Sequence, residues 1–458
     1  PVAQSCHSMQ TEIKEISSVE YELRLHVPAE ELQPELDRLL RQIRAHVQLK
    51  GFRPGKAPLS LVKKLYGDEV ALELAERKIR EALEQAVLEP GTYRVIGRPR
   101  VLRLDYKPDA DLHAVLRFGV RPEFELKPLD QETIPHLVHQ VTDEEVEEAI
   151  KRLQKEEAEL VDLPADTPLG AEDYAVVDLQ RLDEATGTPI IGEKEEGVSF
   201  FLDDPRLREE LRQALLGKKA GETVRVDLPH GDEEAGEPAH THRYEVRVRE
   251  TKRRELPALD AEFIQKISRG QVSDEAGLRE LVRKELQARW DQESRELLEQ
   301  EIMHRLLTLH PIPVPESAVE MVLDEFVEDV RQRNNGRLPE GFDETAFRHA
   351  NRALAEQQAR WTFIFDKVVE TFGIEVTEAD IQAFFEKQAD PESGLSAEQL
   401  RQFYESVPGL IDQVRSRLLH QKVFDTLAER FKLEDLDREA YIERLKAQRE
   451  SAEARNPE

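Results

Sequence analysis

Apolar and polar positions alternate over residues 20–27 and then change to a helical period. The alternation predicts a strand whose buried side carries Tyr21, Leu23, Leu25 and Val27. From Leu32 onward the apolar residues recur at helical spacing, at Leu36, Leu39, Leu40, Ile43 and Val47. Pro34 is then expected in the first turn of this helix, where its missing N–H costs nothing.

The helical pattern breaks before a short glycine- and proline-containing segment. The helix cannot pass Gly51 and Pro54, and the next helical period begins near Leu59 and runs to Glu89. Residues 51–58, with the sequence GFRPGKAP, are therefore predicted to form the exposed tip of a helix-loop-helix. Short strands are predicted at 93–96, 100–105 and 111–120. Together these elements predict an α+β domain over residues 9–118.

A proline-bearing linker and a second α+β domain follow. The linker is assigned to residues 119–165 and contains a helix entered through Thr142, with Glu145 as its capping partner. The second domain is assigned to residues 166–252. Its predicted elements are a short helix at 205–216 and strands at 174–182, 198–202, 223–228 and 242–250.

The remainder, residues 253–458, is predicted to be helical almost to its polar tail. The amphipathic segments are predicted at 274–310, 316–333, 343–372, 378–388, 397–432 and 437–449. Long helices joined by short breaks favour arms or hairpins over a single globule. The predicted fold class is therefore multidomain α+β with an elongated all-α C-terminal domain that carries helical arms.

Charge is distributed unevenly along the 458 residues, which carry a net charge of −30. Residues 9–118 hold 19 basic and 18 acidic side chains, so this segment is at +1 and the rest of the chain at −31. Residues 38–66 contain eight Lys or Arg and no Asp or Glu. A solvated basic face explains such a window, and so does a contact with a polyanion such as a ribonucleoprotein.

Several classes of function find no support in the sequence. No apolar run approaches the roughly 18 residues of a membrane helix, and the N-terminus lacks the order of a secretory signal, which favours a cytoplasmic protein without membrane contact. Cys6, the single cysteine, lies in a polar leader of residues 1–8 before Met9, and the sequence leaves open whether translation starts at Met9. There is no glycine-rich phosphate loop, and His230, His240 and His242 lack further ligands at useful spacing. We therefore expect no cofactor and no metal.

Phe52 lies between two glycines and beside Arg53 and Lys56. An aromatic residue at such a tip either folds back into its own hairpin or projects as an anchor for a partner. The sequence alone leaves both arrangements open.

The segment from Gly51 to Pro58 resembles the signature loop of the trigger factor family, bacterial ribosome-associated chaperones. The order of the chain is also similar, with a linker, an FKBP-like domain and a helical region after the loop domain. The resemblance implies docking at the ribosomal tunnel exit, on ribosomal protein and rRNA. Pro54 stands where the family often has a lysine. The candidate ribosome-binding residues are Arg41, Arg44, Lys50, Gly51, Phe52, Arg53, Gly55, Lys56 and Pro58.

The resemblance also implies a peptidyl-prolyl isomerase domain, whose pocket needs aromatic walls around the prolyl ring. The family's first-strand aromatic position is occupied by Leu179, and the segment 229–238 contains no aromatic residue. The candidate pocket residues are Leu179, Phe200, Phe201, Leu211 and Tyr244. These side chains could instead fill the domain core, so we expect weak or absent isomerase activity.

A folding helper that uses no ATP must bind unfolded chains through exposed apolar surface. In the predicted arms the candidate client-binding residues are Met321, Val322, Phe326, Trp361 and Phe365, although core packing also explains each of them. The preferred interpretation is a chaperone for nascent polypeptides that dimerises reversibly when free of the ribosome. A freestanding isomerase and an acidic helical scaffold without clients remain as alternatives.

Overall fold

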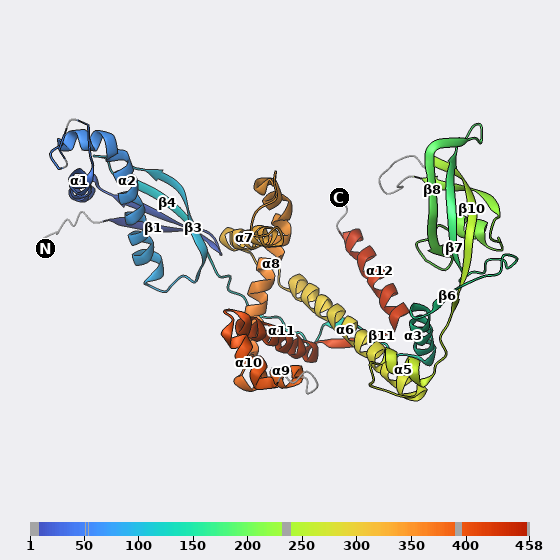
Figure 1. Ribbon diagram of the computed structural model, residues 1–458. Helices are drawn as coiled ribbons and strands as arrows, with labels where there is room; N and C mark the ends of the chain where they lie inside the picture. The colour runs from blue at the N-terminus through green and yellow to red at the C-terminus, as the bar shows by residue number, and fades with distance from the viewer. Residues whose placement is uncertain (1–8, 51, 54, 231–239, 390–395, 456–458) are drawn as a thin grey trace. The chain divides into compact units, whose positions relative to one another are not determined.

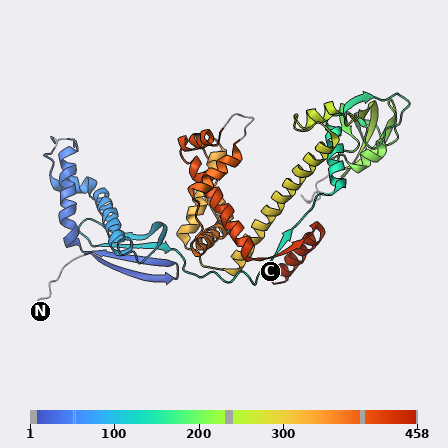
Figure 2. The same cartoon turned by 90° about the horizontal axis from the view of Figure 1, so that it is seen from below.

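A computed structural model describes residues 9–50, 52–53, 55–230, 240–389 and 396–455. The chain divides into two compact units. The first combines residues 1–137 with 295–458, and the second consists of residues 138–294, so in sequence the second is an insertion into the first. Figures 1 and 2 show the elements of both units in two views. The predicted leader, residues 1–8, lies outside the described residues.

The N-terminal part of the first unit is a four-stranded antiparallel sheet in the order β1-β2-β4-β3. Its strands are β1 (Gln10–Ser17), β2 (Glu20–Val27), β3 (Val95–Asp105) and β4 (Leu112–Val120). The predicted strand at 20–27 is confirmed with those bounds, and its buried side carries Leu23, Leu25 and Val27. The sequence analysis missed β1, an edge strand with almost no buried position and therefore no periodic signal.

Two helices cover the buried face of this sheet. They are α1 (Ala29–His46) and α2 (Leu59–Leu83), and a π-helical turn, η1 (Glu84–Leu88), continues α2. The prediction that Pro34 lies in the first turn is wrong, because α1 already begins at Ala29 and Pro34 is its sixth residue. The apolar period starts only at Leu32 and does not reveal the polar first turn, in which Glu30 and Glu31 favour the helix N-terminus.

The second unit contains an antiparallel sheet in the order β6-β10-β7-β8, with β9 also paired to β10. Its elements are β6 (Glu159–Asp162), β7 (Tyr174–Leu182), β8 (Pro189–Phe201), α4 (Glu209–Leu215), β9 (Thr223–His230) and β10 (His240–Glu255). Helix α4 packs its Leu211 and Leu215 into the core of this sheet. The predicted strand at 174–182 is confirmed, whereas β8 is longer than predicted and β6 was missed.

Helices of the second unit form their own small core. It joins α3 (Asp143–Glu156), α5 (Ala261–Ile267) and the start of α6 (Glu275–Leu309) through Val146, Ile150, Ile264, Leu278 and Val282. The predicted capping box of α3 is present. The Thr142 hydroxyl accepts from the Glu145 amide, and the Glu145 carboxylate accepts from the Thr142 amide at 2.8 Å.

The C-terminal part of the first unit is mostly helical. After α6 come α7 (Glu316–Arg333), α8 (Glu344–Phe372), α9 (Glu378–Gln388), α10 (Ala397–Ser406), α11 (Leu410–Arg430) and α12 (Arg438–Arg455). The prediction of one helix over 397–432 is wrong, because the chain breaks between α10 and α11. Gly409 has a φ of +85° there and follows Pro408, a breaker signal that the sequence analysis overlooked. None of the described helices is long and apolar enough to cross a membrane.

One parallel strand pair joins distant parts of the first unit. Strand β5 (Thr133–Leu137) pairs in register with β11 (Lys432–Leu436). Ile134 of β5 and Leu129 before it belong to the same core as residues of α6, α7, α8 and α11. The C-terminal part is therefore not all helical, and a segment assigned to the linker contributes to its core.

Candidate functional site

The connection between α1 and α2 closes back on the end of α1. The Gly55 amide donates to the Arg44 carbonyl at 3.1 Å, and the Lys56 amide donates to the Arg53 carbonyl at 2.9 Å. Gly55 has a φ of +79°, a conformation that favours glycine. Gly51, also a candidate contact residue, and Pro54 lie outside the described residues. The loop is thus anchored to the helix that carries the basic stripe.

The basic side chains of α1 and this loop form no ion pairs within the described part of the chain. No described residue forms an ion pair with Arg38, Arg41, Arg44, Lys50, Arg53, Lys56 or Lys64. Most arginines elsewhere are compensated; Arg348, for example, contacts the carboxylates of Glu320, Asp324 and Glu344. Apart from Lys63, which pairs with Asp109, and Arg38, which interacts with Glu35, the described cations of the acid-free window therefore form a surface of uncompensated positive charge, which attracts polyanions.

Phe52 lies at the tip of this surface. Its side chain is 39% exposed and does not belong to the core under the sheet. The packing at the base of the loop is supplied instead by Ala57, which is buried, and by the partly buried Leu49 and Leu59. Pro58 is exposed next to them. This placement favours a projecting Phe52 over one folded into its hairpin.

A groove of about 440 Å³ opens on the sheet of the second unit. Leu179 of β7 and Tyr244 of β10, two of the five candidate pocket residues, line it. The rest of the lining is Arg181, Gly192, Glu193, Lys194, Glu195, Arg208, Leu228, Pro229 and His242. Arg181 pairs with Glu193 at 2.8 Å across it.

The other three candidate pocket residues lie elsewhere. Phe200 and Leu211 belong to the domain core, and Leu211 is buried. Phe201 packs against Arg254, whose guanidinium carbon lies 3.4 Å from the ring centroid. The structure therefore does not assemble the five into one pocket. Among the described lining residues, Tyr244 is the only Phe, Tyr or Trp, so the groove is mostly polar where a prolyl ring would need dry aromatic walls.

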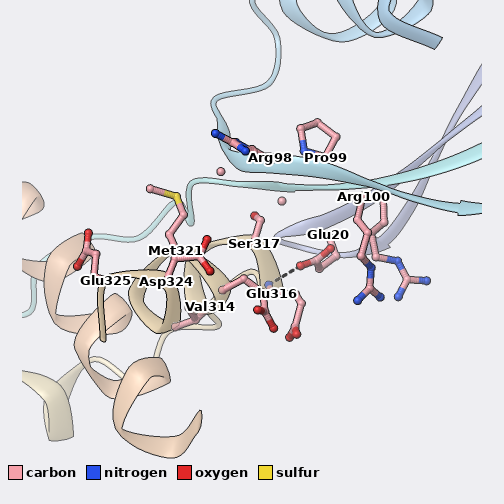
Figure 3. A pocket seen from close by; sticks show the side chains of 14 residues that line it. Glu20, Arg98, Pro99, Arg100, Val314, Glu316, Ser317, Met321, Asp324 and Glu325 are labelled. Atoms are coloured by element: carbon pink, nitrogen blue, oxygen red, sulfur yellow. Dashed lines mark hydrogen bonds between the residues drawn. The ribbon is translucent and has the colours of Figure 1, made fainter. Parts of the chain in front are cut away.

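A cleft of about 990 Å³ lies in the first unit between the sheet and the start of α7 (Figure 3). The Glu316 amide donates to Glu20 Oε1, and the Ser317 hydroxyl donates to the Ile96 carbonyl, each at 2.6 Å. The cleft is lined by Arg98, Arg100 and Arg117 and by Glu316, Glu320, Asp324 and Glu325, with Met321 among them. This arrangement offers both charges and one flexible apolar contact to a bound chain.

Comparisons with known proteins identify the family. A family model of the bacterial trigger factor protein matches residues 9–153, and a model of its C-terminus matches residues 276–429. The trigger factor of Salinibacter ruber is 43% identical over 449 residues, which cover 94% of this chain and 96% of that protein. This chain belongs to the bacterial trigger factor family. The resemblance inferred from the loop is thereby confirmed.

A second curated relative agrees with this assignment. The trigger factor of Chlorobaculum tepidum is 32% identical over 419 residues, covering 92% of this chain and 96% of that protein. A solved structure of the trigger factor chaperone matches 91% of this chain and 99% of its own at 20% identity and a TM-score of 0.47. As a member of this family the chain is a molecular chaperone that acts on polypeptide substrates.

The candidate client-binding residues of this trigger factor differ in exposure. Met321 on α7 is 46% exposed. Val322, at 7% exposure, is part of the core, so we remove it from the candidate client surface. Phe326 is half-buried. Trp361 and Phe365 of α8 are also half-buried, in an aromatic cluster with His420 and Phe424 of α11.

Two strongly exposed apolar side chains are absent from the candidate set. Leu354 on α8 is 55% exposed and Phe403 on α10 is 59% exposed. The segment around Phe403 has an amphipathic pattern, which assigns an aromatic residue to the buried face by default. Only the packing of α10 reveals that Phe403 points to solvent while its neighbour Tyr404 packs against Phe385. Sequence periodicity could not have separated the two.

Proposed function

We propose that this trigger factor docks at the ribosomal tunnel exit through the loop of residues 51–58 and the adjoining basic face of α1. One observation carries the proposal: an exposed aromatic residue, Phe52, stands among cations that have no described acidic partner. Arg41, Arg53 and Lys56 would contact rRNA phosphate or acidic protein surface, and Phe52 would enter an apolar pocket. Such docking would place the protein in the cytoplasm.

We further propose that emerging polypeptides are bound, without ATP, by exposed apolar side chains of the helical region. Met321, Leu354 and Phe403 present such surface, and the acidic residues Glu320, Asp324 and Glu325 line the cleft together with Met321. Several weak contacts of this kind hold an unfolded chain while allowing its release. The same side chains support the reversible self-association proposed for the free protein.

Binding to empty and translating ribosomes should respond differently to salt. Docking through cations is expected to weaken by roughly tenfold or more between about 50 and 200 mM salt, since each phosphate contact releases counterions. Ribosomes that carry an unfolded nascent chain should retain the protein at higher salt, because apolar contacts are not screened. Co-sedimentation of the full chain with both kinds of particle across a salt series measures this. Salt-independent binding to empty ribosomes would argue against docking through the basic surface.

Isomerase activity is expected to be weak because Tyr244 is the only aromatic residue among the described residues that line the groove. We expect turnover of a proline-containing tetrapeptide to be near the uncatalysed rate, whose barrier is about 20 kcal/mol. The variant Leu179→Phe adds an aromatic residue to β7 at the groove and should increase any activity. Leu179→Met changes the same position without adding an aromatic ring and serves as the control. Fast turnover by the unchanged protein would show that the polar lining is compatible with catalysis.

A further inference from the structure

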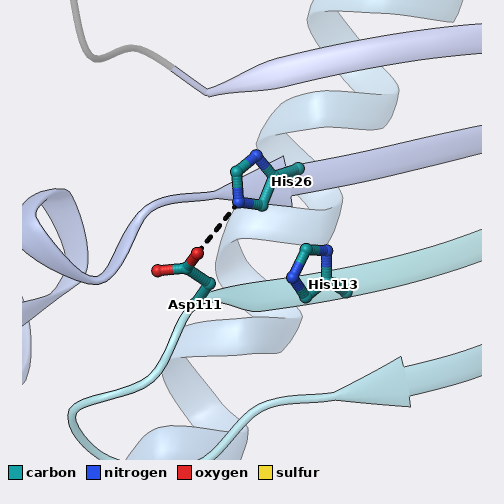
Figure 4. A group of neighbouring side chains, drawn as sticks. All are labelled: His26, Asp111 and His113. Carbon is teal, nitrogen blue, oxygen red and sulfur yellow. Dashed lines mark hydrogen bonds and ion pairs between the residues drawn. The ribbon is translucent and has the colours of Figure 1, made fainter.

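Two histidines lie side by side on the exposed face of the N-terminal sheet. His26 of β2 and His113 of β4 are direct partners in the antiparallel register. Their sequence neighbours Leu25, Val27, Leu112 and Ala114 are buried, so the two imidazoles project from the face opposite α1 and α2. The rings stack with centroids 4.6 Å apart and an interplanar angle of 11° (Figure 4).

A carboxylate is fixed beside the two rings. Asp111 precedes β4, and its Oδ1 accepts from the Ala29 amide at 2.8 Å, which ties the side chain to the first residue of α1. Its Oδ2 lies 3.2 Å from His26 Nε2. Each of the three residues therefore offers one ligand atom, and these atoms all lie within 4.8 Å of one another.

The surroundings favour a cation. The group opens on a hollow of about 750 Å³, which gives access from solvent. Glu12, Glu22 and Asp105 line the hollow, and Asp105 is the register partner of His113 on its other side. Of the basic side chains that line it, Arg103 pairs with Asp105 at 2.5 Å, and Arg24 lies 3.7 Å from Glu22, whose carboxylate also accepts from Arg117 at 2.7 Å. Each basic side chain of the described lining thus has a carboxylate nearby, which reduces its repulsion of a bound cation, and Glu12 adds a further negative charge.

We propose that His26, Asp111 and His113 form a binding site for a first-row divalent cation, with Zn²⁺ as the expected occupant. Two imidazole nitrogens and one carboxylate oxygen are the ligand types that Zn²⁺ takes in three-ligand sites, with water in the fourth position. Tetrahedral coordination at about 2.1 Å requires ligand atoms roughly 3.4 Å apart. Rotation of the half-buried His26 and of the exposed Asp111 and His113 side chains would close the remaining distance. The Ala29 amide orients the carboxylate from behind, as outer hydrogen bonds do in metal sites.

This site departs from the expectation that the chain binds no metal. The sequence analysis considered His230, His240 and His242, which are close in sequence. His26 and His113 are far apart in sequence and meet only through the pairing of β2 with β4. A bound cation would join these two strands to the start of α1, the helix that leads to the basic loop.

Titration of the full chain with ZnCl₂, monitored by calorimetry, tests the proposal. We expect one tight site per chain, and the variants His26→Gln and His113→Gln should each weaken it by at least about tenfold. Asp111→Asn keeps an acceptor for the Ala29 amide while losing the charge, and it should weaken binding as well. The control His349→Gln changes an exposed histidine of α8 and should leave the affinity unchanged.

A second measurement separates this site from scattered weak binding to acidic side chains. With Cu²⁺ as the probe, electron paramagnetic resonance should report coordination by two imidazole nitrogens in the unchanged protein and by one in each histidine variant. Circular dichroism of the metal-free variants checks that they fold. The proposal is overturned if the folded variants bind Zn²⁺ as tightly as the unchanged chain, or if the copper spectrum shows no paired imidazoles.

Discussion

Replacing Phe52 with alanine is expected to weaken binding to empty ribosomes by about 2 kcal/mol, roughly thirtyfold. The side chain is exposed at the tip of a loop whose backbone hydrogen bonds to the end of α1, and this restraint on the backbone reduces the entropy lost on binding. An aromatic residue presented in this way is the type of side chain that dominates interfaces when it enters a pocket. Arg53→Ala should cost less affinity and reduce the dependence of binding on salt.

The chain supplies matched controls for both substitutions. Phe403→Ala removes an even more exposed phenylalanine from α10 and should leave binding to empty ribosomes unchanged. Lys63→Ala removes a cation of the same domain that is already paired with Asp109, and its effect should be small. Co-sedimentation at fixed salt gives the affinities. Equal binding by folded Phe52→Ala and by the unchanged protein would exclude the loop tip as the anchor.

Replacing Arg253 with glutamine is expected to destabilise the sheet of the second unit by about 2 kcal/mol at neutral pH. Asp173 is buried at 4% exposure, and Arg253 donates to both of its carboxylate oxygens at 2.7 Å. Without the guanidinium, the Gly170 amide is the only donor among the described residues that the buried carboxylate keeps. We expect less than the ~3–5 kcal/mol of a fully buried pair, because Arg253 is 51% exposed.

Hydrogen exchange of β7 amides in the full chain measures this loss, which corresponds to a roughly thirtyfold larger opening equilibrium. Arg206→Gln is the control, since Arg206 is 89% exposed in its pair with Asp204 and should contribute little. The double variant Arg253→Gln, Asp173→Asn should recover part of the stability, because it leaves no buried charge. If Arg206→Gln and Arg253→Gln increase hydrogen exchange in β7 equally, the pairing of the buried Asp173 carboxylate does not contribute to the stability of the sheet.

The same pair gives the second unit an acid-sensitive stability. Hydrogen bonds from Arg253 hold the pKa of Asp173 below its ordinary value, against the opposing effect of burial. Because the pKa is lower in the folded state, the pair stabilises the sheet above the unfolded pKa of about 3.9. This stabilisation is lost as the pH falls through the lowered folded pKa. In Arg253→Gln the loss of protection should begin at a higher pH.

Much of the fold could be predicted because its signals are local. The alternation over 20–27, the capping box at Thr142 and the helical period of 316–333 each depend on a few neighbouring residues, and each is confirmed. The tip at 51–58 was likewise located by its glycines and prolines. The break at Pro408 is also a local signal, so its omission was avoidable.

What could not be predicted depends on pairing between distant segments. The burial of Val322 and the exposure of Phe403 follow from how helices meet, which periodicity on one helix does not specify. The stacking of His26 on His113 follows from strand register. The separation of Leu179 and Tyr244 from Phe200, Phe201 and Leu211 also requires the three-dimensional sheet.

The pairing of β5 with β11 sets an order of events during synthesis. His136 and Asp435, whose side chains lie 2.8 Å apart at this ladder, are separated by 299 positions in the sequence. Residues 138–294 form a contiguous unit that can acquire its structure as soon as it leaves the tunnel. The helical core cannot be completed until roughly the last sixty residues are synthesised, because α11 and β11 belong to them. Pairing β11 with β5 then closes the long loop between the two strands, which carries an entropic cost. A newly made copy of this chaperone thus spends most of its own translation as an incompletely assembled polypeptide.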